Sequence, residues 1–303
     1  MRAVAATPWR TLPSMRVLIT GAEGQLGRSL QRVLGARDVV ATGHAALDVS
    51  VDSSVRRAVD AARPDVIIHA AALTDTALCE RDPDLAHAVN AVGAANVARA
   101  SMKCGAMYIA ISTDEVFGGD AQRPYRELDR PAAVNAYGAS KLRGEQMALE
   151  AAGSVARIVR TSWLYGEHGN NFPAKILAAA RAGRPLRFVT DEVSAPTATD
   201  DLAVAIRALI DRHAPAGIYH LVNEGQASRF DWAREVLRLA GMAGLNIEPV
   251  TVAQLRAGGY DGPRKPAYAV LANTRARALG ITMRPWRDAL VDYFRRAQVS
   301  AGG

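Results

Sequence analysis

The chain has 303 residues, of which 49% are hydrophobic and 22% charged, as in packed globular proteins. No apolar run approaches the roughly 20 residues that a membrane-spanning helix needs, so we expect no membrane partner. The formal net charge of +7 favours anionic partners such as nucleotides. The arginines are dispersed without a dense basic run, so we expect no nucleic-acid partner.

Two further features bear on where the protein is found. Residues 1–14 lack the long apolar segment of a signal peptide, and we expect an extension there, with Met15 as an alternative start. Cys79 and Cys104 are too few for a disulfide framework and have no CxxC or HxxxH partner nearby. We therefore expect a cytoplasmic protein without a metal site.

Strands and helices are predicted to alternate through the first half of the chain. Short apolar runs closed by glycine or polar residues predict buried strands, and the segments between them predict helices. In chain order the expected elements are strand 16–20, helix 25–34, strand 38–41, helix 53–62, strand 65–69, mainly helix over 83–104, strand 106–112, helix 137–151 and strand 155–160. This alternation indicates an α/β fold with a Rossmann-type, doubly wound parallel sheet.

The alternation weakens after about Trp163, where loops such as 191–197 separate the helices. We therefore expect three parts. These are the extension 1–14, a dinucleotide-binding Rossmann core over residues 15–165, and a smaller C-terminal substrate lobe over residues 166–303 that is interleaved with the core.

A glycine-rich turn, Thr-Gly-Ala-Glu-Gly-Gln-Leu-Gly over residues 20–27, joins the first predicted strand to the first helix. Gly21 allows a tight turn, Gly24 lets the backbone approach a pyrophosphate, and Gly27 permits close packing of the helix on the strand. The spacing is GxxGxxG rather than GxGxxG, and an ordinary turn is the alternative interpretation. The strand before it and the helix after it are the context that a dinucleotide site requires.

The end of the second predicted strand, residues 41–44, reads Ala-Thr-Gly-His and carries no acid. An acid there would bind the ribose hydroxyls of NADH. Its absence removes repulsion of a 2′-phosphate, which Arg28 or His44 could attract. We expect NADPH or NADH, with NADPH accepted at least as well. Asp48 stands where a loop could touch adenine, and it suits the start of a helix equally well.

Small and polar residues follow two further strands. Ala70, Ala71 and Ala72 leave room for a ribose or a nicotinamide, although alanine is equally common in simple close packing. Ser-Thr-Asp at 112–114 ends another strand, and parallel sheets bind ligands at the carboxyl ends of their strands. A hydroxyl there could bind a carbonyl oxygen, and a turn or a helix cap is the alternative.

Tyr137 and Lys141 lie four residues apart in Ala-Tyr-Gly-Ala-Ser-Lys, which places both side chains on one face of a helix. A nearby ammonium lowers the pKa of a phenol, so we expect Tyr137 to exchange a proton with a substrate carbonyl near neutral pH. A Tyr and a Lys at this spacing are more often a solvated helix face. Together with the glycine turn upstream, they indicate a redox enzyme.

These residues resemble the extended short-chain dehydrogenase/reductases and, more narrowly, the dTDP-4-dehydrorhamnose reductase family. The resemblance extends from Met15 to about Phe294. It is carried by the segments 24–27, 112–114, 137–142, 160–165, 169–172, 195–197 and 217–221. Thr-Ser-Trp at 161–163 and Ala-Pro-Thr at 195–197 are the segments that point to the reductase branch.

The resemblance implies NAD(P)H-dependent reduction of the C4 ketone of a dTDP-linked 4-keto-6-deoxy sugar, most narrowly dTDP-4-dehydrorhamnose to dTDP-L-rhamnose. It implies that Tyr137 protonates the alkoxide, that Lys141 lowers the tyrosine's pKa and holds the nicotinamide ribose, and that Thr113 binds the C4 oxygen. The oligomeric state stays open, and a homodimer is possible.

The same resemblance implies the binding residues. Asp114, Trp163 and Arg264 would join Thr113 at the substrate. The cofactor would be held by Gly21, Gly24, Gln25, Leu26, Gly27, Asp48, Val49, Ala70, Ala71, Ala72, Tyr137 and Lys141.

The chain departs from the family's pattern at two positions. Glu115 stands where the reductases usually have Tyr, and Lys265 replaces an Arg before Pro266. Ser-Thr-Asp-Glu-Val resembles the dTDP-glucose 4,6-dehydratases, in which the Asp-Glu pair performs an elimination. A 4,6-dehydratase and a non-catalytic nucleotide-sensing subunit are therefore the alternatives to a reductase, which the segments after Lys141 favour.

Overall fold

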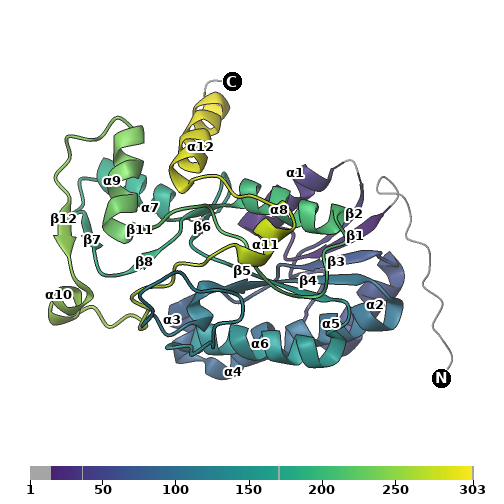
Figure 1. Ribbon diagram of the computed structural model, residues 1–303. Coiled ribbons are helices and arrows are strands. Elements are labelled where there is room, and N and C mark those ends of the chain that lie inside the picture. The colour runs from purple at the N-terminus through teal and green to yellow at the C-terminus, as the bar shows by residue number, and fades with distance from the viewer. Residues whose placement is uncertain (1–14, 36, 170, 302–303) are drawn as a thin grey trace.

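A six-stranded parallel sheet with the strand order β10-β5-β4-β3-β1-β2 forms the centre of the molecule (Figure 1). The computed structural model describes residues 15–35, 37–169 and 171–301, so the predicted extension 1–14 lies outside the described residues. The strands are β1 (Arg16–Thr20), β2 (Asp38–Thr42), β3 (Val66–His69), β4 (Met107–Thr113), β5 (Ala156–Thr161) and β10 (Gly217–His220). The predicted α/β fold is confirmed, whereas β10 was not among the predicted strands.

Helices cover both faces of the sheet, because successive residues of a buried strand point to opposite sides. Leu18, Ile67 and Ile158 belong to the core on one side, and their neighbours Ile19, Ile68 and Val159 belong to the core on the other. The first face is covered by α2 (Asp52–Ala62), α5 (Gly93–Cys104) and α6 (Ala136–Ala152), and the second by α1 (Gln25–Leu34) and α8 (Thr199–Asp211).

The segment predicted to be mainly helix over 83–104 is interrupted. After α3 (Thr76–Arg81) come α4 (Pro83–Ala86) and a π-helical stretch, η2 (His87–Val92), which leads into α5. Asn90 lies in η2, and its Nδ2 donates to Ser140 Oγ on α6 at 2.9 Å. The wider π turn therefore places a buried polar contact between two helices, which hydrophobic periodicity does not reveal.

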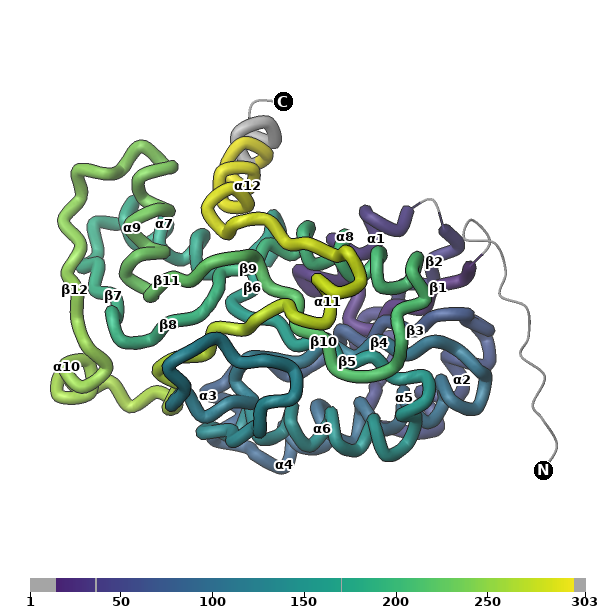
Figure 2. Tube along the Cα trace, in the orientation of Figure 1, coloured from purple at the N-terminus to yellow at the C-terminus, as the bar shows by residue number. Residues whose placement is uncertain are grey.

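Residues after 165 supply the strand β10, the helix α8 and most of a second lobe (Figure 2). Three two-stranded pairings run through this half: β6 with β9, β8 with β11, and β7 with β12. The lobe packs around the buried rings of Trp232, Trp286 and Tyr165. The remaining elements are η3 (Asp114–Val116), β6 (Leu164–Tyr165), α7 (Phe172–Arg181), β7 (Arg187–Val189), β8 (Val193–Ser194), β9 (Thr197–Ala198), β11 (Ala227–Ser228), α9 (Arg229–Leu239), β12 (Glu248–Val250), α10 (Val252–Ala257), α11 (Thr274–Ala278) and α12 (Trp286–Ala301).

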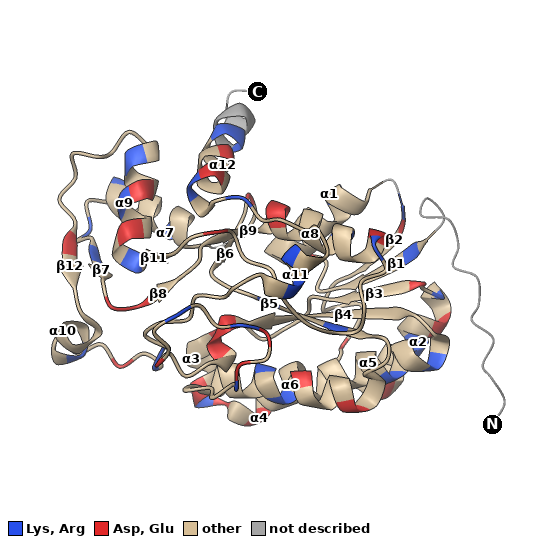
Figure 3. Cartoon of the chain, viewed as in Figure 1, with Lys and Arg blue, Asp and Glu red and all other residues tan. Residues whose placement is uncertain are grey.

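Charged residues of both signs are mixed along the helices that Figure 3 shows, for instance on α2 and α9. Several pair locally, such as Arg56 with Asp52 at 2.7 Å and Arg238 with Glu235 at 2.6 Å. None of the described helices combines the length and the apolar character needed to cross a bilayer.

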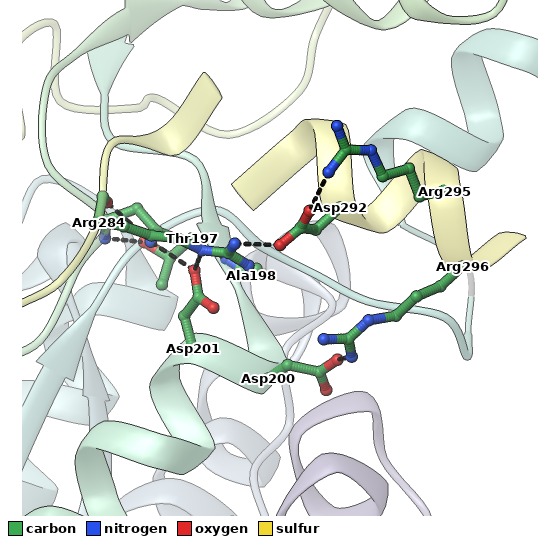
Figure 4. Close-up of polar contacts among 9 residues, drawn as sticks. Thr197, Ala198, Asp200, Asp201, Arg284, Asp292, Arg295 and Arg296 are labelled. Carbon is green, nitrogen blue, oxygen red and sulfur yellow. Dashed lines mark hydrogen bonds and ion pairs between the residues drawn. The ribbon is translucent and has the colours of Figure 1, made fainter. Parts of the chain in front are cut away.

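A network of ion pairs holds α12 against α8 (Figure 4). Arg284 Nε donates to Asp201 on α8 at 2.8 Å, and its Nη1 pairs with Asp292 on α12. Arg296 on α12 pairs with Asp200 on α8. The pairing with Arg284 lowers the pKa of Asp292, which shows that the folded state favours the ionised carboxylate.

Replacing Arg284 by Met should lower the free energy of unfolding by about 1–3 kcal/mol, because Asp201 and Asp292 each lose a charged partner. Urea denaturation measures this value. Arg295→Met is the matched control, since the Arg295 side chain is 75% exposed and meets Asp292 only at 3.3 Å. The control should change the stability by less than about 0.5 kcal/mol, and an equal loss in both variants would contradict the role of Arg284.

Candidate functional site

A cavity of about 720 Å³ opens where β1, β3, β4 and β5 end. Such an edge is where open parallel sheets bind their ligands. The sequence-predicted residues that line it are Gly21, Gly24, Gln25, Leu26, Gly27, Ala70, Ala72, Thr113, Asp114, Tyr137, Lys141 and Trp163. The structure therefore brings both predicted groups, the glycine turn and the Tyr–Lys pair, to one cavity.

Four of the predicted residues do not line this cavity. Asp48 accepts hydrogen bonds from Ser50 N at 2.9 Å and Ser50 Oγ at 2.6 Å, and these bonds lower its pKa. Val49 is buried, and Ala71 lies against Gly21. Arg264 borders a neighbouring cavity of about 510 Å³. Their predicted binding roles stay predictions.

The glycine turn is closely packed. Gly21 has φ +69°, and a Cβ on it would lie 2.6 Å from Ala71 N. A Cβ on Gly27 would lie 2.3 Å from the carbonyl oxygen of Gly21. Only glycine permits this path. Beside it, Gln25 Oε1 is buried without a hydrogen-bond partner among the described residues, which leaves an acceptor for a donor group of a dinucleotide.

Helix α6 positions Tyr137 and Lys141. Its N-cap, Asn135, accepts a hydrogen bond from Gly138 N at 2.7 Å, which fixes the first turn. Thr113, at the end of β4, lies near enough to Tyr137 to lower the pKa of its phenol. Three groups from two elements thus line the same cavity.

The net shift of the Tyr137 pKa is upward, and the expected lowering by Lys141 stays a prediction. Burial raises the pKa of Tyr137, the charge of Glu115 raises it further, and Thr113 only partly opposes this rise. Burial also lowers the pKa of Lys141, to about 8, while the charge of Glu145 opposes that fall. Because desolvation disfavours both charged forms, Tyr137 stays a protonated phenol, which is the form that can donate a proton.

Asp114 is held in place beside this group. Ser194 Oγ donates to Asp114 Oδ2 at 2.6 Å, and Thr113 Oγ1 donates to Oδ1 at 3.1 Å. Burial, with the charge of Glu115, raises the pKa of Asp114 to about 7. The carboxyl group therefore takes up a proton near neutral pH.

Glu115 and Lys265, at which a departure from the family's pattern was expected, contact each other. Lys265 Nζ lies 2.8 and 3.0 Å from the two carboxylate oxygens of Glu115. Asn135 Nδ2 donates to Glu115 Oε2 at 2.6 Å and to the carbonyl oxygen of Arg264 at 2.8 Å. The carboxylate of Glu115 is therefore already engaged by a cation and an amide, and it ties the 264–265 segment to the start of α6.

Sequence reasoning missed Arg229, which lines the cavity at the start of α9. Its guanidinium lies 3.6 Å from the ring centroid of Trp163, and that ring stacks on Trp232 at 5.6 Å. Trp163 has φ +42°, a rare conformation for a non-glycine residue that often marks functional sites. No local pattern relates Arg229 to Trp163, so only the fold reveals the contact.

Sequence reasoning also missed an acid beside the tip of β2, whose own residues 41–44 carry none. A Cβ on Gly43 would lie 2.3 Å from the carboxylate carbon of Glu23, so the Glu23 side chain fills the space over Gly43. The acid comes from the glycine turn instead of from β2 itself. It stands at the strand tip where an acid binds the adenosine ribose in Rossmann folds.

A Rossmann sheet with a glycine turn after β1, a hydroxyl at the end of β4 and a Tyr–Lys pair on α6 defines a short-chain dehydrogenase/reductase. The family model described as the RmlD substrate binding domain matches residues 15–299. The chain belongs to the dTDP-4-dehydrorhamnose reductase family.

Named relatives agree with this assignment. The chain is 39% identical to a dTDP-4-dehydrorhamnose reductase of Mycolicibacterium smegmatis, over 92% of this chain and 85% of the relative. It is 37% identical to a dTDP-4-keto-6-deoxy-D-glucose reductase of Streptomyces niveus, over 92% and 96%. The crystal structure of a dTDP-4-dehydrorhamnose reductase from Bacillus anthracis in complex with NADP matches with a TM-score of 0.88 and 38% identity, over 93% of this chain and 99% of that chain.

Replacing Glu23 by Gln should raise the preference for NADPH over NADH by about tenfold, because a 2′-phosphate no longer meets a carboxylate at the tip of β2. The ratio of the two dissociation constants, from nucleotide fluorescence titrations, measures this preference. Asp48→Asn is the control for the other predicted acid and should leave the ratio unchanged. A shift in the Asp48 variant alone would assign the ribose hydroxyls to Asp48.

Proposed function

We propose that the protein uses NAD(P)H to reduce the C4 ketone of a dTDP-4-dehydro-6-deoxy sugar, with dTDP-4-dehydrorhamnose as substrate and dTDP-L-rhamnose as product. The observation that carries the proposal is the meeting of Thr113, Tyr137 and Lys141 in the cavity that the glycine turn also lines. The named relatives support the choice of a dTDP-linked 4-keto sugar.

The residues of the chain supply binding, orientation and the proton. The glycine turn, with Gln25 and Lys141, would hold the dinucleotide, whose reduced nicotinamide supplies the hydride. Thr113 would hold the C4 oxygen, and Tyr137 would donate its phenolic proton as that oxygen gains negative charge. The charge of the Lys141 ammonium favours the phenolate that remains.

The pairing of Glu115 argues for reduction instead of elimination. A dehydratase needs a second group free to remove a proton from the sugar, and here both carboxylate oxygens of Glu115 face Lys265 Nζ within 3.0 Å. A non-catalytic nucleotide-sensing role would not require Thr113, Tyr137 and Lys141 to meet in one cavity.

Two wider expectations belong to this proposal. A cytoplasmic location suits Cys79 and Cys104, which are both free thiols. A homodimer and the absence of a nucleic-acid partner stay predictions.

Tyr137→Phe should reduce turnover of dTDP-4-dehydrorhamnose by roughly a hundredfold or more, because no proton is delivered to the C4 oxygen. Loss of nicotinamide absorbance measures turnover, and the dissociation constant of NADPH should stay nearly unchanged. Tyr268→Phe is the control, since that hydroxyl donates to Gln226 Oε1 at 3.0 Å and does not line the cavity. Near-normal turnover in the Tyr137 variant would show that the proton comes from another group.

Glu115→Gln should reduce ketone turnover by about tenfold or less, because the carboxylate anchors Lys265 and takes no part in proton transfer. Lys265→Met should have a similar effect, since it breaks the same contact. The purified wild-type protein should carry little NAD and should not consume dTDP-glucose. Stoichiometric bound NAD, together with dTDP-glucose consumption that Glu115→Gln abolishes, would reassign the protein as a dehydratase.

A further inference from the structure

A buried ion pair lies next to the site, and the proposed reaction does not use it. Glu145 on α6 and Arg160 at the end of β5 have side chains that are 4% and 2% exposed. Arg160 Nε donates to Glu145 Oε1 at 2.9 Å, and Arg160 Nη2 donates to Oε2 at 2.6 Å. This bidentate geometry is typical of a guanidinium bound to an ionised carboxylate.

A third donor joins the pair. Ser112 Oγ donates to Glu145 Oε1 at 2.5 Å. Ser112 directly precedes Thr113 on β4, and the sheet register pairs Ser112 with Arg160 on β5. The carboxylate of Glu145 therefore joins two strands and one helix at the point where the strands deliver Thr113 to the cavity.

Glu145 is also the anion nearest in sequence to the catalytic pair. Tyr137, Lys141 and Glu145 follow one another at intervals of four residues and share one face of α6. The Lys141 side chain is 6% exposed, and its ammonium donates no hydrogen bond to any residue in the described part of the chain. Burial lowers the pKa of Lys141 to about 8, and the charge of Glu145 opposes that fall.

The other ionisable groups near Lys141 supply no anion for it. His69, on β3, is buried and has a pKa lowered to about 3 by burial and by Lys141, so it is neutral. Tyr137 is a protonated phenol, as its raised pKa shows. The charges of Asp114 and Glu115, from η3, raise the pKa of Tyr137.

We propose that Glu145 is a positioning residue that keeps Lys141 protonated in the site, and that Arg160, with Ser112 as a further donor, holds Glu145 as the anion that this requires. A carboxylate buried without those donors would take up a proton and lose its effect on Lys141. The proposal rests on the proposed function only in assigning the cofactor ribose to Lys141.

The test is the pH dependence of NADPH binding, which needs no sugar substrate. Affinity should fall as the pH rises through the pKa of Lys141, near 8 in the wild-type protein. In Glu145→Gln the pH at which half of this affinity change has occurred, the midpoint, should be lower by about 1 unit or more, because loss of an anion disfavours the ammonium. The basic limb of kcat/KM should move in the same direction.

Three variants separate this role from simple support of the fold. Ser112→Ala leaves both hydrogen bonds from Arg160 to Glu145, which keep the carboxylate charged. It should therefore lower the melting temperature but leave the midpoint nearly in place. The double variant Glu145→Gln, Arg160→Met leaves no unpaired buried guanidinium and should still show the lowered midpoint, even if Glu145→Gln alone does not fold. In Lys141→Met the pH dependence near 8 should disappear.

Two outcomes would overturn the role of Glu145, and a third would overturn only the proposed function. A midpoint that stays in place in the double variant, with only stability lost, would overturn the proposal. Persistence of the same pH dependence in Lys141→Met would overturn it as well. If the wild-type protein binds NADPH with the expected pH dependence but reduces no dTDP-linked ketone, the proposed function fails and the role of Glu145 stands.

Discussion

The site depends on how closely α6 approaches the segments beside it. A Cβ on Gly138 would lie 2.1 Å from the carbonyl oxygen of Glu115, and a Cβ on Gly144 would lie 2.3 Å from that of Asn90. Both distances are far below van der Waals contact, so the helix lies at this depth only because these positions have no side chain. The proposed catalytic pair, Tyr137 and Lys141, lies on the same helix, so its depth relative to Thr113 at the end of β4 is set by these contacts.

Glu115 and Lys265, the two positions at which a departure from the family's pattern was expected, form one structural unit. An acid at 115 alone would place an unpaired carboxylate beside Asp114 and raise the pKa of its neighbours further. Lys265 balances that charge from the other lobe, 150 residues away in sequence. The carboxylate of Glu115 can therefore lie at the cavity without being left unpaired.

Much of the fold could be predicted from the sequence, because buried parallel strands are unbroken apolar runs that a short stretch of sequence reveals. β10 was missed because only two of its four residues are buried, at the edge of the sheet. The Tyr137–Lys141 pair could be predicted, since both residues lie on one helix. The Glu23–Gly43 and Glu115–Lys265 contacts could not, because each joins segments that no periodic pattern relates.

The strand β10 and the helix α8 also determine how the polypeptide can be divided. β10 pairs with β5, and α8 packs on α1, which directly follows the glycine turn. A fragment ending at residue 165 would contain every residue of that turn and the Tyr–Lys pair. It would nevertheless expose the free edge of β5 and the apolar face of α1, and unpaired strand edges promote aggregation. The residues proposed to bind the nucleotide therefore do not make up a unit that folds alone, and a split-protein reporter would need both fragments before either half became stable.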